Sequence, residues 1–418
     1  MKKIALLHFA YPPNIGGVEG MVKEHAEILT NLGYEITMIT GSGEEKNPKI
    51  KLVVIPELQS VMSFNPFLQE KILDKGIIDD EFYKLADTID QGLEKALDKI
   101  DVVVTHNMIT IVRNLPFVYA FKNFVKKYPK KKYFGWIHDH SYINEFQIKD
   151  LSKIVNSKLE KELLTTPIKN LTYILISESF REPFVHLMGL HDGETVVIPN
   201  GIDIRYFLEI DDLIWEIIEK YNLIKKFPLI LSPVNILERK NIDYCLDIIR
   251  ELKKTYPQIC YIVTGKPSSH RSTLEYYENL KKKIENLGIK DNVMFFNDFL
   301  NRALMRSEIH DLYQIADMVF FLSKSENFGL PLLEAALTKT AILVSDLKVF
   351  REVGGEFIKY IDYRAVSPEK AAELVKNFIE QSLRVKLNYR SRSQYDLKTI
   401  LKEKFIPLIE KNPSSWYN

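Results

Sequence analysis

The sequence predicts an α/β protein that contains two doubly wound parallel β-sheets. The chain of 418 residues is too long for one small hydrophobic core. Short runs rich in Val and Ile recur along it, and they are too continuously apolar for half-exposed antiparallel strands. Longer amphipathic patterns separate these runs, which is the alternation expected when helices connect parallel strands.

The predicted strands follow one another at similar spacing in both halves of the chain. In the first half they are KIALLHF, YEITMIT, VVVTH, YFGWIH and TYILIS. In the second half they are FPLILSPV, CYIVTG, NVMFF, MVFFLS and AILVS. Between Glu57 and Ile100 no strand pattern is convincing, and EFYKLADTIDQGLEKALDKI predicts a helix.

The junction between the halves lies near VVIPNGIDIRYF, where Pro-Asn-Gly supplies turn residues. We therefore expect domains at residues 1–197 and 198–390, followed by an amphipathic C-terminal helix within 391–418. Open α/β sheets bind ligands beyond the carboxyl ends of their strands. Two such domains facing one another predict a ligand site in a central cleft.

The composition excludes several classes of partner. Lys and Arg total 57 against 56 acidic residues, so no global field favours nucleic acid. The two cysteines, Cys245 and Cys260, fit buried reduced thiols better than a disulfide. The N-terminus predicts a first strand rather than a signal peptide, and no apolar stretch reaches the roughly 20 residues of a membrane span. We expect a cytoplasmic protein, with peripheral association at the inner face of the membrane as the alternative.

The basic run KKYPKKKY, Lys126–Tyr133, allows two interpretations. It is either a solvated connection between a helix and the following strand or a docking site for an anionic acceptor or lipid headgroups. The run is short, which favours the solvated connection.

The stretch SENFGLPLLEAAL, Ser325–Leu337, has the residues of a helix start beside a ligand. Gly329 permits a backbone conformation closed to other residues, and Pro331 fits the first helical turn. Such a helix favours an anion at its free N–H groups, which we expect at Gly329, Leu330 and Leu332. Glu326 and Glu334 can accept hydrogen bonds from hydroxyl groups in the same pocket. An ordinary strand–loop–helix turn explains the isolated pattern equally well.

Two further stretches carry glycines or cations directly after a predicted strand. Gly16-Gly17 follows the first strand and allows close backbone approach to a ligand, although the spacing is not that of a dinucleotide fingerprint. Arg239-Lys240 follows the first strand of the second half and can neutralise a diphosphate. The alternative for this pair is a solvated helix start capped by Asn241.

These motifs together resemble the family 4 glycosyltransferases, retaining enzymes that use nucleotide sugars and have the GT-B fold of two Rossmann-like domains. The resemblance covers nearly the whole chain through IGGVEG, WIHD, SESFRE, VIPNGID, ERKN, TGKP and ENFGLPLLEAAL, in that order. It implies transfer of a hexose from a donor of the GDP-mannose or UDP-glucose type to a hydroxyl acceptor. It also implies that no cofactor or metal is needed, with the nucleotide sugar as co-substrate. The resemblance further implies that residues 1–197 bind the acceptor, that residues 198–390 bind the donor, and that the helix within 391–418 crosses back to the first domain.

The resemblance assigns roles to individual residues. Glu326 would contact the donor sugar, Lys240 the diphosphate, and His138 the reacting face of the sugar, which makes these three the catalytic candidates. The implied donor-binding residues are Gly16, Gly17, Arg239, Asn235, Gly329, Leu330, Pro331 and Glu334. On the acceptor side the weaker candidates are His106, Asn107 and Asp139. A buried core histidine remains the alternative for His138, and a loop turn remains the alternative for His106-Asn107.

One residue departs from the family pattern. Family members commonly have an Arg where this chain has Asn235, and that Arg helps the lysine to hold the diphosphate. Phosphate charge must therefore be met by Arg239, by another cation or by the helix N-terminus.

Metal ligands and rival functions complete the prediction. No D-x-D motif occurs, and neither Asp79-Asp80-Glu81 nor His138-Asp139-His140 has convincing metal-ligand spacing. The rival functions are a nucleotide-sugar epimerase or phosphorylase on the same fold and a non-catalytic subunit that binds nucleotide sugar. The glycine spacing argues against a dinucleotide oxidoreductase.

Overall fold

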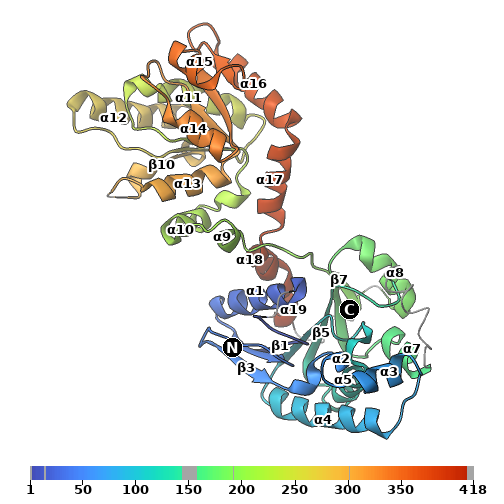
Figure 1. The fold of residues 1–418 in the computed structure, drawn as a ribbon. Coiled ribbons are helices and arrows are strands. Elements are labelled where there is room, and N and C mark those ends of the chain that lie inside the picture. Colours follow the sequence, from blue (N-terminus) through green and yellow to red (C-terminus); the bar gives the residue numbers. More distant parts are fainter. Residues whose placement is uncertain (1, 14–15, 144–157, 192, 301, 412–418) are drawn as a thin grey trace. The chain divides into compact units, whose positions relative to one another are not determined.

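The computed structural model describes residues 2–13, 16–143, 158–191, 193–300 and 302–411 (Figure 1). The chain divides into two compact units, residues 1–201 with 397–418 and residues 202–396. Each unit contains a parallel β-sheet with helices packed against it, which confirms the predicted fold class. The division falls close to the boundaries expected from the sequence, with the first at 201/202 instead of 197/198.

The first unit contains a sheet of seven described strands in the order β3-β2-β1-β4-β5-β6-β7, all parallel. The strands are β1 (Lys3–His8), β2 (Glu35–Thr40), β3 (Ile50–Val54), β4 (Val102–His106), β5 (Lys132–Ile137), β6 (Leu171–Leu175) and β7 (Thr195–Val197). The order reverses between β1 and β4, and a ligand crevice is expected beyond the carboxyl ends of the strands at such a point.

Helices cover both faces of this sheet because the internal strands have apolar residues on both faces. On β1, Ala5 and Leu7 pack into one core cluster, while Ile4 and Leu6 pack into another on the opposite face. The described helices are α1 (Gly17–Asn31), α2 (Val61–Phe64), α3 (Pro66–Leu73), α4 (Asp80–Leu97), α5 (Leu115–Lys127), α7 (Lys158–Thr165) and α8 (Glu178–Met188), with short 3₁₀ turns η1 (Pro56–Leu58) and η2 (Val112–Asn114). The sheet is therefore doubly wound.

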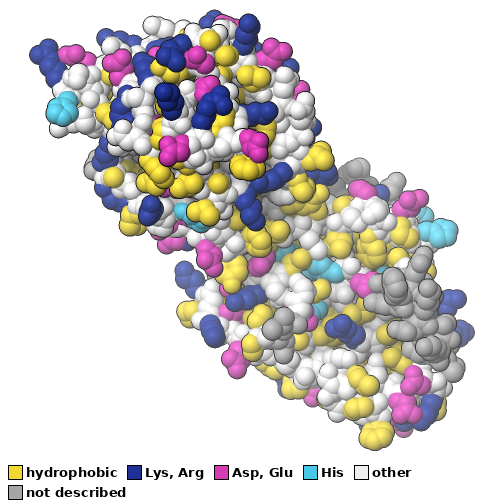
Figure 2. Space-filling view, turned by 45° about the horizontal axis from the view of Figure 1, so that its top comes forward, with side chains coloured by type: hydrophobic (Ala, Val, Ile, Leu, Met, Phe, Trp, Pro, Cys, Tyr) yellow, Lys and Arg dark blue, Asp and Glu magenta, His cyan; other side chains and the backbone are white. Residues whose placement is uncertain are grey.

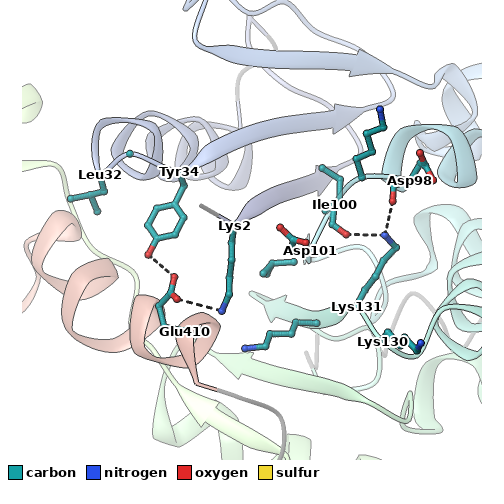
Figure 3. A pocket seen from close by; sticks show the side chains of 13 residues that line it. Lys2, Leu32, Tyr34, Asp98, Ile100, Asp101, Lys130, Lys131 and Glu410 are labelled. Atoms are coloured by element: carbon teal, nitrogen blue, oxygen red, sulfur yellow. Dashed lines mark hydrogen bonds and ion pairs between the residues drawn. The ribbon is translucent and has the colours of Figure 1, made fainter.

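The C-terminal segment belongs to the first unit. It consists of α18 (Leu397–Ile400), the π-helical turn η7 (Leu401–Phe405) and α19 (Ile406–Glu410). Phe405 packs against Trp136 of β5, with 5.4 Å between ring centroids. Tyr34 donates a hydrogen bond to Glu410 (3.0 Å), and Lys2 forms an ion pair with the same carboxylate (3.4 Å; Figure 3).

Two lysines of the basic run before β5 form hydrogen bonds with carbonyl oxygens near the ends of two helices. Lys131 donates to the carbonyl oxygens of Asp98 (3.1 Å) and Ile100 (2.8 Å) just after α4 (Figure 3), and to that of Leu97 (2.7 Å) at the end of the helix. Lys132 donates to the carbonyl oxygen of Ile409 (2.7 Å) near the end of α19. Cations are favourable at helix C-termini, where carbonyl groups lack partners. These lysines line a cavity of 930 Å³ at the amino ends of the strands, and the solvated-connection interpretation accounts for them without a ligand.

The second unit contains a sheet of six described strands in the order β10-β9-β8-β11-β12-β13, also parallel. The strands are β8 (Leu229–Ser232), β9 (Cys260–Val263), β10 (Val293–Phe295), β11 (Met318–Phe321), β12 (Ala341–Ser345) and β13 (Lys359–Ile361). This is the strand order of a Rossmann domain, and the order reverses between β8 and β11.

The helices and turns of the second unit surround this sheet (Figure 1). They are α9 (Ile204–Phe207), α10 (Asp212–Lys220), η3 (Leu223–Lys225), η4 (Glu238–Lys240), α11 (Ile242–Lys253), α12 (Arg271–Asn286), η5 (Lys290–Asn292), η6 (Phe296–Asp298), α13 (Arg306–Ile315), α14 (Leu330–Leu337), α15 (Lys348–Gly354), α16 (Pro368–Gln381) and α17 (Leu383–Gln394). Cys245 on α11 and Cys260 on β9 are buried free thiols, as predicted.

The helix α17 belongs to the second unit, although the sequence suggested that the crossing segment begins at Ser391. Arg392 is the reason, because its guanidinium is buried in the second unit and donates to Asp317 (2.5 Å). The same guanidinium donates to the carbonyl oxygens of Ile224 (2.6 Å) and Lys226 (2.9 Å). The segment that returns to the first unit therefore begins at Leu397.

The surface carries charges of both signs. On the face drawn in Figure 2, Lys and Arg side chains are interspersed with Asp and Glu side chains, in line with the near balance of charge in the sequence. Within the described ranges, none of the helices has the length and apolar character required to cross a membrane.

Candidate functional site

The carboxyl ends of β8 and β11 in the second unit bring together three of the predicted charged residues. Arg239 and Lys240 lie in η4 after β8, and Glu326 lies in the loop after β11. These are the two strands between which the sheet order reverses. Lys240 donates to Glu326 Oε1, and Arg239 Nη1 donates to Glu326 Oε2 (3.1 Å). Two cations and one carboxylate leave a net positive charge where a Rossmann domain binds its ligand.

Burial and hydrogen bonding have opposite effects on Glu326. Its side chain is 10% exposed, and burial alone would raise its pKa. Hydrogen bonds from Lys240 and Ser323, together with the charges of Lys240 and Arg239, outweigh burial and lower the pKa of Glu326. The Ser323 hydroxyl donates to Oε1 at 2.9 Å. The carboxylate is therefore ionised at neutral pH and held in place from both sides of the crevice.

The local backbone holds the two cations at this position. The ammonium of Lys240 lies 5.2 Å from the centroid of the Phe321 ring, which ends β11. The backbone N–H of Lys324 donates to the carbonyl oxygen of Arg239 (2.7 Å), which ties the β11 loop to η4. Asn241 adopts a left-handed conformation with φ of 57° before α11, and its side chain makes no cap hydrogen bond. Asn241 therefore occupies the N-cap position, as the alternative expected, but without the cap hydrogen bond.

The start of α14 has the predicted backbone but fewer free N–H groups. Gly329 has φ of 116°, and a Cβ added there would lie 2.9 Å from the Phe350 ring. Pro331 lies in the first turn, as predicted. The Leu332 N–H donates to the carbonyl oxygen of Gly329 (2.9 Å), which contradicts the expectation that it is free. Leu330 is half exposed at the start of the helix.

Glu334 lies one turn into α14 and accepts a hydrogen bond from the Tyr313 hydroxyl (3.0 Å). Burial is the largest cause of a raised pKa at Tyr313, and the Glu334 charge adds to it. Tyr313 therefore remains a donor that orients the carboxylate.

Asn235, the residue that departs from the family pattern, follows β8 and is exposed.

The crevice of the first unit contains a cavity of 590 Å³ at the carboxyl ends of β1, β4, β5 and β6. Gly16 and Gly17 line it at the start of α1, as predicted. A Cβ added at Gly17 would meet no atom within 4 Å, whereas one added at Gly16 would overlap the Glu19 carboxylate. The open space beside Gly17 is consistent with close backbone approach by a ligand.

Of the candidate histidines, His138 lines this cavity and His106 does not. His106 is fully buried and stacks between Trp136 and His138, with ring centroids 5.5 and 5.9 Å away. His106 therefore lies beneath the cavity rather than on its acceptor side. Burial, followed by the charge of His8, lowers the pKa of His138 to about 4. At neutral pH its imidazole is uncharged, and its Nε2 is buried with no hydrogen-bond partner among the described residues.

Asn107 positions the backbone of the β5 loop. It has φ of 52°, an uncommon conformation for a residue with a side chain, and it lines the cavity. Its side-chain oxygen accepts from the backbone N–H groups of His138 (3.0 Å) and Asp139 (2.8 Å). Asp139 does not line the cavity, and its carboxylate accepts from the backbone N–H of His140 (2.8 Å).

Four polar residues that line the cavity were not nominated from the sequence, namely His8, Glu19, Arg113 and Asn200. His8 ends β1, and its Nδ1 donates to the carbonyl oxygen of His106 (2.7 Å). Its Nε2 lies 3.5 Å from Glu19 Oε1, and the hydrogen bond with His8 is the largest cause of the lowered pKa of Glu19. The position of His8 at a strand end was the available signal. Arg113 lies in a stretch without a recognisable motif.

Asp79-Asp80-Glu81 has a structural role. Asp79 accepts from the Glu81 N–H at the start of α4, and both side chains form ion pairs with Lys71. Across the parts of the chain that the structure describes, no group of three or more His, Cys, Asp or Glu residues could hold a metal ion.

Both units have a Rossmann-like parallel sheet whose strand order reverses once, and proteins of this class bind ligands beyond the carboxyl ends of the strands at such a point. Residues 214–394 match the family described as glycosyl transferases group 1. Mannosylglucosylglycerate synthase from Petrotoga mobilis is 24% identical over 84% of each chain, and the protein of that name from Thermotoga maritima is 22% identical over 86% of this chain and 84% of its own. Sucrose-phosphate synthase from Thermosynechococcus elongatus has a TM-score of 0.38 and 15% identity over 98% of both chains. Residues 214–394 therefore resemble the glycosyl transferases of group 1, and the two relatives extend the similarity over most of the chain.

Proposed function

We propose that the protein is a retaining, metal-independent hexosyltransferase that transfers a sugar from a nucleoside diphosphate donor of the GDP-mannose or UDP-glucose type to a hydroxyl acceptor. The observation that carries the proposal is the cluster of Arg239, Lys240 and Glu326 at the strand-order reversal of the second unit. Positive charge at this point stabilises the departing diphosphate as its charge develops.

The residues of the second unit divide between the parts of the proposed donor. Lys240 and Arg239 bind the diphosphate, and Glu326 accepts hydrogen bonds from the donor sugar. Glu334, oriented by Tyr313, accepts from the ribose hydroxyls. In the proposed same-face mechanism a leaving phosphate oxygen takes the proton of the acceptor hydroxyl. The low pKa of His138 supports this assignment, because an imidazole with a pKa of about 4 is a weak base and competes poorly with the phosphate oxygen for the proton of the acceptor.

The first experiment is a thermal-shift panel of UDP, GDP and ADP and their hexose derivatives. One nucleotide should raise the melting temperature well above the others, because a ligand that binds only the folded state stabilises it. A donor that binds but yields an epimer without any acceptor would favour the epimerase. Turnover that requires inorganic phosphate would favour the phosphorylase, and donor binding without any turnover would favour a non-catalytic subunit.

We further propose that the acceptor carries a carboxylate or phosphate beside its hydroxyl group. Arg113 is the exposed cation that lines the cavity of the first unit, and the described residues provide no ion pair for it. The neighbouring buried Asn114 fixes its backbone by donating to the carbonyl oxygens of Glu57 (2.8 Å) and Gln59 (2.7 Å). Two relatives are named for a product that contains glycerate, which is an organic acid.

Arg113→Gln should therefore remove a preference for acidic acceptors. With the preferred donor, the wild type should use glucosylglycerate at least tenfold better than its methyl ester, because a hydrogen bond to a charged group contributes roughly 1.5–3 kcal/mol. Arg113→Gln should lose about 10- to 100-fold in kcat/KM for the acid and little for the ester. Equal use of acid and ester by the wild type would contradict the acidic acceptor and leave the donor assignment intact.

A further inference from the structure

Asn235 is neutral, but Lys266 carries a positive charge on the neighbouring segment after β9. The strands β8 and β9 are paired along their length. Leu229 pairs with Cys260 at their beginnings, and Ser232 pairs with Val263 at their ends. Beyond the strands, an isolated parallel bridge joins Ile236 to Pro267 with the same offset. Counting one residue back on both segments places Asn235 opposite Lys266.

Close backbone contact holds the two segments together at this position. The N–H of Ile236 donates to the carbonyl oxygen of Lys266 (3.0 Å). A Cβ added at Gly265 would lie 2.4 Å from the Cα of Asn235, so the glycine is needed for this approach. Paired parallel segments run about 4.8 Å apart, and paired residues face the same side. A lysine side chain is long enough to span that separation.

The ammonium of Lys266 is available for a ligand. Lys266 is half-buried, and no described residue forms an ion pair or hydrogen bond with its side chain. Arg239 and Lys240, in contrast, share Glu326. Arg239, Lys240 and Glu326 together carry one net positive charge, whereas the diphosphate of a nucleotide sugar carries two negative charges. One more cation beside η4 would balance the diphosphate.

We propose that Lys266 binds the donor diphosphate in this chain and supplies the positive charge that the neutral Asn235 opposite it lacks. The inference rests on the proposed function and adds to it a diphosphate-binding residue on a different segment. The TGKP motif, which the sequence offered only as part of a resemblance, then has a defined role. The added positive charge lies after β9, at the position paired with Asn235 after β8.

Isothermal titration calorimetry on the wild type and three variants of the full chain tests this proposal. The titrant is whichever of UDP, GDP and ADP binds the wild type most tightly, with the matching nucleoside as a ligand without phosphate. Lys266→Ala should bind the diphosphate about 10- to 100-fold more weakly. Binding of the nucleoside should not change. Lys282→Ala is the matched control, because this exposed lysine lies on α12 and its removal should leave diphosphate affinity within twofold of wild type.

The decisive variant restores the charge at its alternative position. Lys266→Ala combined with Asn235→Arg should recover diphosphate affinity to within about threefold of the wild type, since a guanidinium at position 235 can reach the same phosphates. A purely structural role for Lys266 would not be rescued in this way. Lys266→Ala with unchanged diphosphate affinity, or a double variant as weak as Lys266→Ala, would overturn the inference. If the wild type binds none of the three diphosphates, the proposed function fails first.

Discussion

Lys240→Met should lower kcat/KM for the sugar donor by about 100- to 1,000-fold, the range observed when one preorganised electrostatic group is removed from a transition-state site. The ammonium of Lys240 is the most buried positive charge of the second-unit cluster, with 11% of its side chain exposed. Methionine keeps an unbranched apolar chain beside Phe321 while removing the charge. Steady-state kinetics with the preferred donor measure the effect, and circular dichroism checks that the variant is folded.

Lys290→Ala is the control for this prediction. Lys290 lies in the same unit, its side chain is 77% exposed, and its ion pair with Glu285 spans 3.9 Å. Removing an exposed charge of this kind should change kcat/KM less than twofold, because exposed ion pairs contribute little. A comparable loss in Lys290→Ala would mean that the overall charge of the unit, rather than the position of Lys240, determines donor use.

Arg392→Ala should destabilise the second unit by about 3–5 kcal/mol at pH 7.5, because it leaves the buried carboxylate of Asp317 without its partner. Asp317 also accepts from the N–H of Leu229 (2.7 Å), so the ion pair joins the beginnings of β8 and β11 to α17. Differential scanning calorimetry should show the transition of the second unit at a much lower temperature. Arg390→Ala, an exposed position on the same helix, should leave this transition almost unchanged.

The loss in Arg392→Ala should be smaller at pH 5. Burial raises the pKa of Asp317 from 3.8 to about 6, although Arg392 opposes this effect. Between these values the folded state binds more protons than the unfolded state, so the contribution of Asp317 to stability decreases as pH rises through 6. Without Arg392 the pKa of Asp317 rises further, and protonation at pH 5 removes the unpaired charge. A loss that is as large at pH 5 as at pH 7.5 would contradict this explanation.

The strands that the sequence did not predict share a position in the fold. They are β3, β7 and β13, and each lies at the edge of its sheet. An edge strand has one neighbour and a partly solvated face, so it lacks the continuous apolar run of a buried parallel strand. In β3 only Ile50 is fully buried, and β7 and β13 have three residues each. The internal strands were predictable because both of their faces are covered.

The site residues that could be predicted from the sequence are those that stand in a motif. Lys240 and Glu326 could be nominated because each stands in a recognisable motif directly after a strand. His8 had only its strand-end position as a signal, and Arg113 had none, because its role depends on which strands lie beside its turn in the folded chain. His106 shows the reverse case, since a strand-end position suggested exposure, whereas Trp136 and His138 cover its ring. Sequence spacing identifies strand ends but does not reveal which side chains the neighbouring loops bury.

Product analysis with Glu326→Ala tests the proposed donor site most directly. With the preferred nucleotide sugar and acceptor, the wild type should release one nucleoside diphosphate per glycoside formed. The anomeric configuration, measured by proton NMR coupling constants, should be retained. Glu326→Ala should lose at least 100-fold in glycoside formation, because the sugar loses a held carboxylate and Lys240 loses its partner. Turnover by Glu326→Ala at the rate of the wild type would contradict the assignment of the second-unit cluster as the donor site.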